Sequence, residues 1–212
     1  MGANTKKLIS VSSGPLCDHA PALKGKLVTM AGALGNDLLQ LLTERNGFYC
    51  FESALHVFPS GCAASVMSIE RWNSTDLWRK DYASAVEGYL FFAEDVFGDQ
   101  FGLNGVKVYR FDPENGEIQE SATSLEKWAG KLLEDTDYET GYSLANAWQQ
   151  QNGPLAPGMR LVPKVPFILG GEYKADNLYA LDAIEAMKYR ADIWNQIKNL
   201  PDGTPVRIKV LN

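Results

Sequence analysis

Histidine and cysteine, the residues that most often carry nucleophilic catalysis or bind zinc, are scarce in this chain. The 212 residues include only His19, His56, Cys17, Cys50 and Cys62. A serine or cysteine nucleophile needs a base within hydrogen-bond reach, and no spacing rule joins either histidine to such a group. The sequence therefore gives no support for a nucleophilic enzyme.

The cysteines are also too few and too scattered for a disulfide-rich secreted protein. Secreted scaffolds usually carry an even and dense set. We expect all three cysteines to be reduced and packed as small apolar residues. The even spacing of Cys50, His56 and Cys62 raises zinc binding as an alternative. Structural zinc sites, however, use closely spaced cysteine pairs, so we predict no metal and no other cofactor.

Long apolar runs and basic clusters are missing as well. No run approaches the roughly 20 apolar residues of a membrane span. The apolar pair Leu8-Ile9, which follows Lys6-Lys7, is too short to be the apolar region of a signal peptide. We therefore expect a cytoplasmic protein without a membrane partner. The formal net charge is −6, and the only basic pairs are Lys6-Lys7 and Arg79-Lys80. We expect no nucleic-acid partner, because binding to the phosphate backbone needs many lysine and arginine side chains. Negative charge favours a basic protein partner.

The bulk composition is that of an ordinary folded domain. Apolar residues make up 45% and charged residues 22% of the chain, close to the average for globular proteins. A chain of this length can bury a full core in one domain. Residues 1–33 show no period, and we interpret them as an irregular N-terminal arm. The folded domain is then expected over 34–212.

The middle of the chain predicts an antiparallel meander. Aromatic and β-branched segments alternate with turns that contain Gly, Asn or Asp, which is typical of consecutive hairpins. The expected strands are 89–93, 100–103, 106–111 and a fourth from 117. Extended chain is also expected at 48–58, and edge or short strands at 161–165, 179–181 and 206–211. The segment 65–81 fits either a short helix or irregular chain.

Apolar residues at helical spacing predict helices on both sides of this meander. The expected helices are 36–45, one that begins at a Thr123/Glu126 capping box, 139–150, and one that begins at an Asp182/Glu185 capping box. The proline-rich segment 153–171 is expected to be a loop. The fold class is therefore α+β, a twisted antiparallel sheet with helices packed around it.

Two groups of residues are candidates for a functional surface. Glu94, Asp95 and Asp99 lie within six residues in one turn. They could hold Mg²⁺ as in a hydrolase, or stay solvated and contact a protein. Trp72 and Trp78 lie on no helical stripe, so we expect them to be exposed, and tryptophan is enriched at interface hot spots. We predict these five residues to form a partner-binding surface.

The meander also resembles the central sheet of the SMI1/KNR4 (SUKH) superfamily. The resemblance is carried by 90–103, LFFAEDVFGDQFGL, and 108–117, VYRFDPENGE. The family pattern is a strand, an acidic Gly-Asp turn, a second strand, and a Val-Tyr strand that leads into a charged turn. The leucine-rich helix before Asn46-Gly47, the tryptophan helix after Thr123 and the tail from Val165 also fit. The resemblance covers about 36–211.

This resemblance implies an α+β fold and no catalytic residues. Bacterial members are mostly immunity proteins that bind and neutralise polymorphic toxins, many of them nucleases, and eukaryotic members are regulatory scaffolds. We expect a non-catalytic protein-binding module that neutralises a cognate toxin, with a basic toxin the natural match for an acidic chain. The alternatives are a regulatory scaffold of the same fold and a small metal-dependent hydrolase that uses the acidic turn. The oligomeric state stays open.

Overall fold

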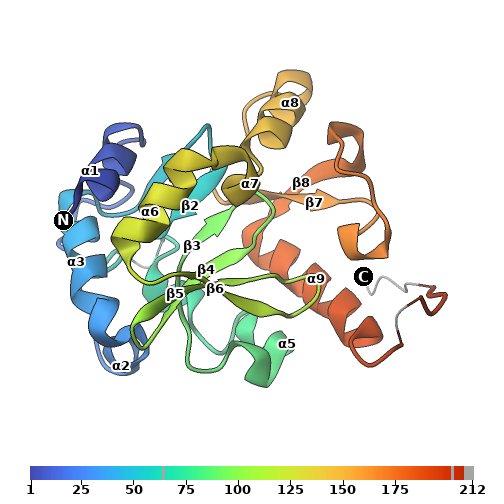
Figure 1. The fold of residues 1–212 in the computed structure, drawn as a ribbon, viewed down its shortest axis with the longest axis horizontal. Coiled ribbons are helices and arrows are strands. Elements are labelled where there is room, and N and C mark those ends of the chain that lie inside the picture. Colours follow the sequence, from blue (N-terminus) through green and yellow to red (C-terminus); the bar gives the residue numbers. More distant parts are fainter. Residues whose placement is uncertain (64, 202, 208–212) are drawn as a thin grey trace.

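A computed structural model of the protein describes residues 1–63, 65–201 and 203–207. An antiparallel sheet runs through its middle, and each strand pairs with the next one along the chain (Figure 1). The strands of this sheet are β1 (Phe48–Cys50), β2 (Leu55–Val57), β3 (Leu90–Asp95), β4 (Gln100–Asn104), β5 (Lys107–Phe111) and β6 (Ile118–Ala122). The predicted meander is confirmed, and β1 and β2 extend it on the N-terminal side.

The hairpin between β1 and β2 explains why 48–58 is not one extended strand. Phe51, Glu52 and Ser53 all adopt positive φ values, a conformation that residues with a Cβ rarely take. The turn is held from outside, because Gln149 donates to the Glu52 carbonyl over 2.9 Å and Asn146 to its carboxylate over 2.6 Å. Distant contacts therefore stabilise a turn that has no glycine to indicate it.

Helices cover the sheet on both faces. They are α1 (Ala3–Ser10), α2 (Lys26–Ala31), α3 (Gly35–Glu44), α4 (Ile69–Trp72), α5 (Arg79–Tyr82), α6 (Leu125–Glu134), α7 (Thr136–Thr140), α8 (Tyr142–Asn152) and α9 (Ala183–Ile197). The four predicted helices correspond to α3, α6, the α7–α8 pair and α9. Asp182 caps α9 as expected, since its carboxylate accepts from the backbone N–H groups of Ile184 and Glu185. The fold class is α+β, as predicted.

Gly141 divides the predicted helix 139–150 into α7 and α8. Its φ is +68°, and a Cβ there would lie 2.3 Å from Cε2 of Phe97. A side chain at this position would both strain the backbone and collide with the turn between β3 and β4. The glycine therefore lets the α7–α8 corner pack directly on that turn.

The N-terminal 33 residues are not the irregular arm that the sequence suggested. They contain α1 and α2, and Leu8, Met30 and Ala31 belong to the main hydrophobic core. The Thr123/Glu126 capping box is also wrong in detail, because Ser124 caps α6 by accepting from the Lys127 N–H. The Glu126 carboxylate instead accepts hydrogen bonds from the backbone N–H groups of Asn4 and Thr5, in the first turn of α1. The N-terminal segment is therefore part of the same domain.

Aromatic residues organise the core on the two faces of the sheet. On one face Phe92 and Phe101 pack edge-to-face against Trp128 of α6. On the other face Phe91 and Phe111 pack against Trp78, and the cluster continues to Tyr82 and Trp194. The sheet is thus the middle layer between α6 and the α4, α5 and α9 side.

A second, two-stranded sheet lies beside the acidic turn. It consists of β7 (Met159–Pro163) and β8 (Leu178–Asp182), which pair antiparallel. Its backbone is tied to the main sheet, because the Leu161 N–H donates to the Val96 carbonyl over 2.8 Å. Figure 1 shows β7, β8 and α9 toward one end of the molecule and α1 and α3 at the other end. The strand predicted at 206–211 falls mostly on 208–211, outside the described residues.

Candidate functional site: the acidic turn and the loop beside it

The acidic turn between β3 and β4 is mostly buried. Glu94 and Asp95 are fully buried, and 20% of the Asp99 side chain is exposed. The prediction of exposed carboxylates is therefore wrong for Glu94 and Asp95. They are the last residues of β3, a central strand whose residues are all buried. The sequence shows three equivalent acids, but the fold leaves only Asp99 within reach of solvent.

Glu94 is the centre of a buried ion pair. Its Oε1 lies 2.8 Å from Nε of Arg160 and 3.1 Å from Nδ1 of His56, and Oε2 accepts from Gln100 over 3.2 Å. The Arg160 Nε–H is not directed at the carboxylate, so this contact is an ion pair rather than a hydrogen bond. All of these groups are held from different strands, β2, β3, β4 and β7.

The charges in this network balance. Burial alone would raise the pKa of Glu94, but Arg160 and His56 outweigh it and the pKa lies below its ordinary value. Burial lowers the pKa of His56 by more than its bond to Glu94 raises it. Glu94 is therefore ionised, His56 is neutral and donates from Nδ1, and Arg160 supplies the compensating charge. These groups are bound to one another in the interior and are not free to act on a substrate.

Trp72 and Trp78 are both fully buried, so the prediction that they form an exposed hot spot is wrong. Trp72 stacks on Phe58 with ring centroids 4.8 Å apart, and its Nε1 donates to Gln100 over 2.7 Å. Trp78 packs on Phe91 and Phe111. Trp72 is the last residue of α4 and Trp78 directly precedes α5. These helices place both rings over the sheet, although neither helix is long enough to show an apolar stripe in the sequence.

Arg110 of β5 binds the remaining acids of the turn. Its Nη2 donates to Asp95 over 2.7 Å and its Nε to Asp99 over 2.8 Å. The other oxygen of Asp95 accepts from the backbone N–H groups of Phe97 and Asp99, each over 2.9 Å. Burial, and next the charge of Asp99, raise the pKa of Asp95 well above its ordinary value. These contacts close the turn and fix its shape.

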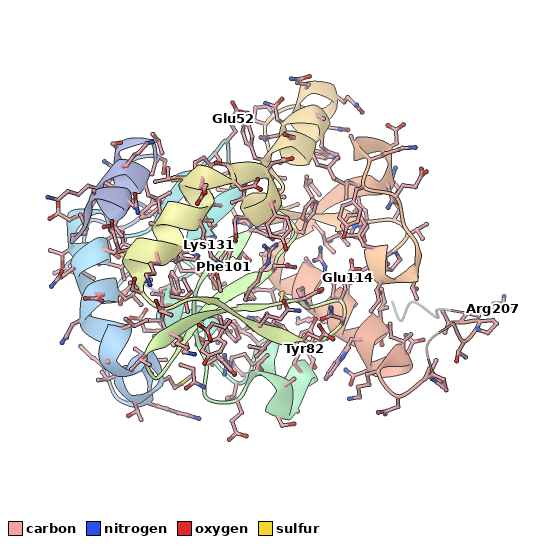
Figure 2. All side chains as sticks on the ribbon, viewed as in Figure 1. Glu52, Tyr82, Phe101, Glu114, Lys131 and Arg207 are labelled. Atoms are coloured by element: carbon pink, nitrogen blue, oxygen red, sulfur yellow. A yellow bond between two sulfur atoms is a disulfide. The ribbon has the colours of Figure 1, made fainter. Side chains whose placement is uncertain are left out.

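A second acidic turn, 112–116, lies beside the first. The hairpin interpretation of this segment is confirmed, since the Asp112 N–H donates to the Glu117 carbonyl. Burial, and then Asp99, raise the pKa of Asp112 to about 7. Glu114 is buried near Arg190 of α9, with 3.9 Å between Oε1 and Nε. Figure 2 shows Glu114 beside α9 and the loop between β7 and β8. The two turns contain the carboxylates of Glu94, Asp95, Asp99, Asp112 and Glu114. The guanidinium groups that pair with them are fewer, those of Arg110, Arg160 and Arg190.

Neither candidate metal site is formed in the described part of the chain. No three side chains of His, Cys, Asp or Glu there are placed to share an ion. Cys62 forms a disulfide with Cys17, and Cys50 is free and buried, with a pKa that burial raises to about 12. The prediction of three reduced cysteines is therefore wrong for Cys17 and Cys62.

Long-range backbone contacts bring those two cysteines together. The Cys17 N–H donates to the Asn46 carbonyl, and Asn46 Nδ2 donates to the carbonyls of His19 and Ser60, each over 2.8 Å. Asn46 thus joins the N-terminal segment to the loop after β2, and the two Cα atoms lie 6.0 Å apart across 45 residues of sequence. Such a separation carries no local signal in the sequence.

The loop between β7 and β8 is the exposed feature that the sequence did not single out. It covers 164–177 and includes two short 3₁₀ turns, Phe167–Leu169 and Ala175–Asn177. Val165, Ile168 and Tyr173 are exposed by 50%, 44% and 69%. The loop is fixed to the second acidic turn, because the Ile168 N–H donates to the Glu114 carboxylate over 3.0 Å. The proline content predicted a loop but not this apolar surface.

A polar hollow of about 520 Å³ lies on the other side of the molecule, between Met1 and α3. Glu44 is the only acidic side chain among the residues that line it, and Asn36, Gln40 and Thr43 supply most of the other polar groups. A single carboxylate among amides and a hydroxyl does not form an acid–base pair. The hollow is therefore a weaker candidate site than the surface around the acidic turns.

Comparison with known proteins adds evidence on the fold alone. No protein-family description and no curated protein matches the chain. The crystal structure of Atu4351 from Agrobacterium tumefaciens is similar, with a TM-score of 0.55 and 14% sequence identity. The match covers 90% of this chain and 88% of that one. A likeness at this identity supports the α+β architecture over the matched 90% of the chain. In the described residues, no helix is long and apolar enough to cross a bilayer.

Proposed function

We propose that this chain is a non-catalytic protein-binding module that neutralises a cognate toxin, as the SMI1/KNR4-like segment 90–117 suggests. The observation that carries the proposal is the surface around the acidic turns. Even without Asp95, whose raised pKa favours the neutral form, the carboxylates of Asp99, Glu114 and Glu139 outnumber the guanidinium groups of Arg110 and Arg190. The adjacent 164–177 loop exposes large apolar side chains. An apolar patch beside negative charge is typical of a surface that binds a basic protein.

The buried carboxylates favour this proposal over the metal-dependent hydrolase. Glu94 and Asp95, two of the three acids that such an enzyme would use, are buried and bound by Arg160, His56 and Arg110. A metal would have to displace those cations before it could bind. The regulatory scaffold of the same fold has no observation in its favour that the toxin-binding proposal lacks.

The proposed place of action is the cytoplasm, because a nuclease toxin attacks nucleic acid there. The Cys17–Cys62 disulfide argues in the other direction, since disulfides are rare in cytosolic proteins. The redox state of these two cysteines in cells lysed directly into an alkylating agent therefore tests the compartment.

Co-expression tests the proposed function directly. We expect the reading frame adjacent to this chain to encode a toxin, and we expect cells that express that toxin to resume growth when this chain is co-expressed. The purified chain should also bind an inactivated form of that toxin domain. Empty vector and the inactivated toxin provide the controls for toxicity. Continued cell death, with this chain soluble and in excess over the toxin, would contradict the proposal.

A further inference from the structure

The 164–177 loop is held in one shape by its own hydrogen bonds. The residues that flank it, Pro163 and Leu178, are paired across β7 and β8, so its two ends lie close together as in a compact Ω-loop. Asn177 clamps its base: Oδ1 accepts from the Val165 N–H over 2.9 Å, and Nδ2 donates to the carbonyls of Val165 and Glu172, each over 3.0 Å. A loop fixed in this way loses little conformational entropy when a partner binds.

Stacked rings hold the most exposed aromatic side chain of the loop in place. Tyr173 lies parallel to Phe167 with ring centroids 3.9 Å apart, and Phe167 packs edge-to-face on Phe97 of the acidic turn. Tyr173 is nevertheless 69% exposed. Large aromatic side chains at interfaces carry much of the binding energy when they are rigid and become buried on binding. This ring is already rigid and still has most of its surface to bury.

The electrostatic surroundings of the ring are negative. Burial, and then nearby carboxylates with Glu114 and Asp99 first among them, raise the pKa of Tyr173 above its ordinary value. The loop itself adds no net charge, because its two lysines, Lys164 and Lys174, are matched by the carboxylates of Glu172 and Asp176. A partner that covers Tyr173 therefore approaches a negative potential and fits best if its own rim is basic.

We infer that the exposed side chains of the 164–177 loop, Val165, Ile168 and Tyr173, contact the toxin. They fit an apolar pocket of the toxin rimmed by lysine or arginine side chains. The inference rests on the proposed function and names its contact surface. It also replaces Glu94, Asp95, Trp72 and Trp78 as expected contacts, all of which are buried. Asp99 keeps a place at the rim of the surface.

Substitution of the exposed side chains tests the inference. The loop variant carries Ile168→Ser and Tyr173→Ser, which leave the Asn177 hydrogen bonds in place. The matched control carries Val106→Ser and Tyr138→Ser, at side chains exposed by 61% and 77% outside the loop. Affinity for the inactivated toxin domain from the adjacent reading frame is measured by calorimetry. We expect at least about a 30-fold loss for the loop variant, as for hot-spot residues, and less than about a threefold change for the control.

The outcomes separate the inference from the proposed function. Wild-type binding and protection, with a loop variant that binds within about threefold of wild type, would overturn the inference alone. An equal loss in the control variant would also overturn it, since the effect would not belong to the loop. If the wild-type chain neither binds the toxin domain nor protects cells, the proposed function fails and the inference fails with it. Thermal unfolding of each variant confirms that it is folded.

Discussion

At the residue scale, the most informative group is the buried carboxylate of Glu94. An ionised carboxylate in a protein interior is costly unless cations and hydrogen bonds compensate it. Arg160, His56 and Gln100 supply that compensation here. Pairs of this kind add little net stability, but removal of one partner leaves the other charge buried and unpaired. Glu94 is therefore a residue on which the fold depends rather than a contact for a partner.

Glu94→Gln is expected to destabilise the protein by about 3–5 kcal/mol, because it leaves the Arg160 guanidinium buried without its counter-charge. Urea denaturation measures the change. The control is Glu120→Gln, which removes a carboxylate from the exposed pair with Lys107 and should leave the midpoint nearly unchanged. Adding Arg160→Met to Glu94→Gln should recover part of the loss. A midpoint for Glu94→Gln equal to that of the Glu120→Gln control would contradict this account.

The sequence could not distinguish Glu94 from Asp99. Both are acidic residues of the same short segment, 94–99. The residue types around them predict an exposed turn and do not indicate which carboxylate is buried. What buries Glu94 is Arg160 on β7 and His56 on β2, which are distant in the sequence and have no spacing relationship to the turn. The same limit applies to Trp72 and Trp78, because the helices that position them, α4 and α5, are only four residues long.

At the scale of elements, Glu126 connects two helices that the sequence treats separately. Its Oε1 accepts from the Asn4 N–H over 2.7 Å, and its Oε2 accepts from the Thr5 N–H over 3.1 Å. The first N–H groups of a helix have no partner within the helix and carry partial positive charge. A carboxylate of α6 thus caps α1, and Gly2, the residue before α1, has no side chain to do so.

Glu126→Gln is expected to loosen α1 without unfolding the domain. The substitution removes the charge that interacts with the helix N-terminus, and loss of a cap costs about 1 kcal/mol. Hydrogen–deuterium exchange should show faster exchange of the amides of Ala3–Ser10, with the sheet amides unaffected. Glu134→Gln, at the exposed other end of α6, is the matched control and should leave α1 unchanged. Unaltered exchange in α1 for the Glu126 variant would show that this cap is dispensable.

The sequence predicted those elements whose signals are local. The meander from β3 to β6 and the helices α3, α6 and α9 carry turn residues and apolar periods within their own length. The elements it missed depend on distant partners. The β1–β2 turn is held by α8, and α1 is capped by α6. The aromatic face of the 164–177 loop is likewise fixed by Phe97 and by Asn177.

At the scale of the whole molecule, the Cys17–Cys62 disulfide links the N-terminal segment to the loop after β2. The link closes 45 residues of chain. Within that span are α2, α3, β1 and β2, so the disulfide closes a loop of about a fifth of the 212-residue chain. Cross-linking stabilises a protein mainly by reducing the entropy of the unfolded chain, and a loop of this length is worth about 2–4 kcal/mol.

Reduction should therefore lower the stability of the wild-type protein by about 2–4 kcal/mol in urea denaturation. A Cys17→Ser, Cys62→Ser variant should match the reduced wild type and show no response to dithiothreitol. Cys50→Ala is the control: it changes the one free cysteine of the described chain and should keep the response to reductant. Alkylation of denatured, unreduced protein should modify Cys50 alone. Modification of all three cysteines, with equal stability in the presence and absence of reductant, would mean that the disulfide does not form and would support the cytoplasmic proposal.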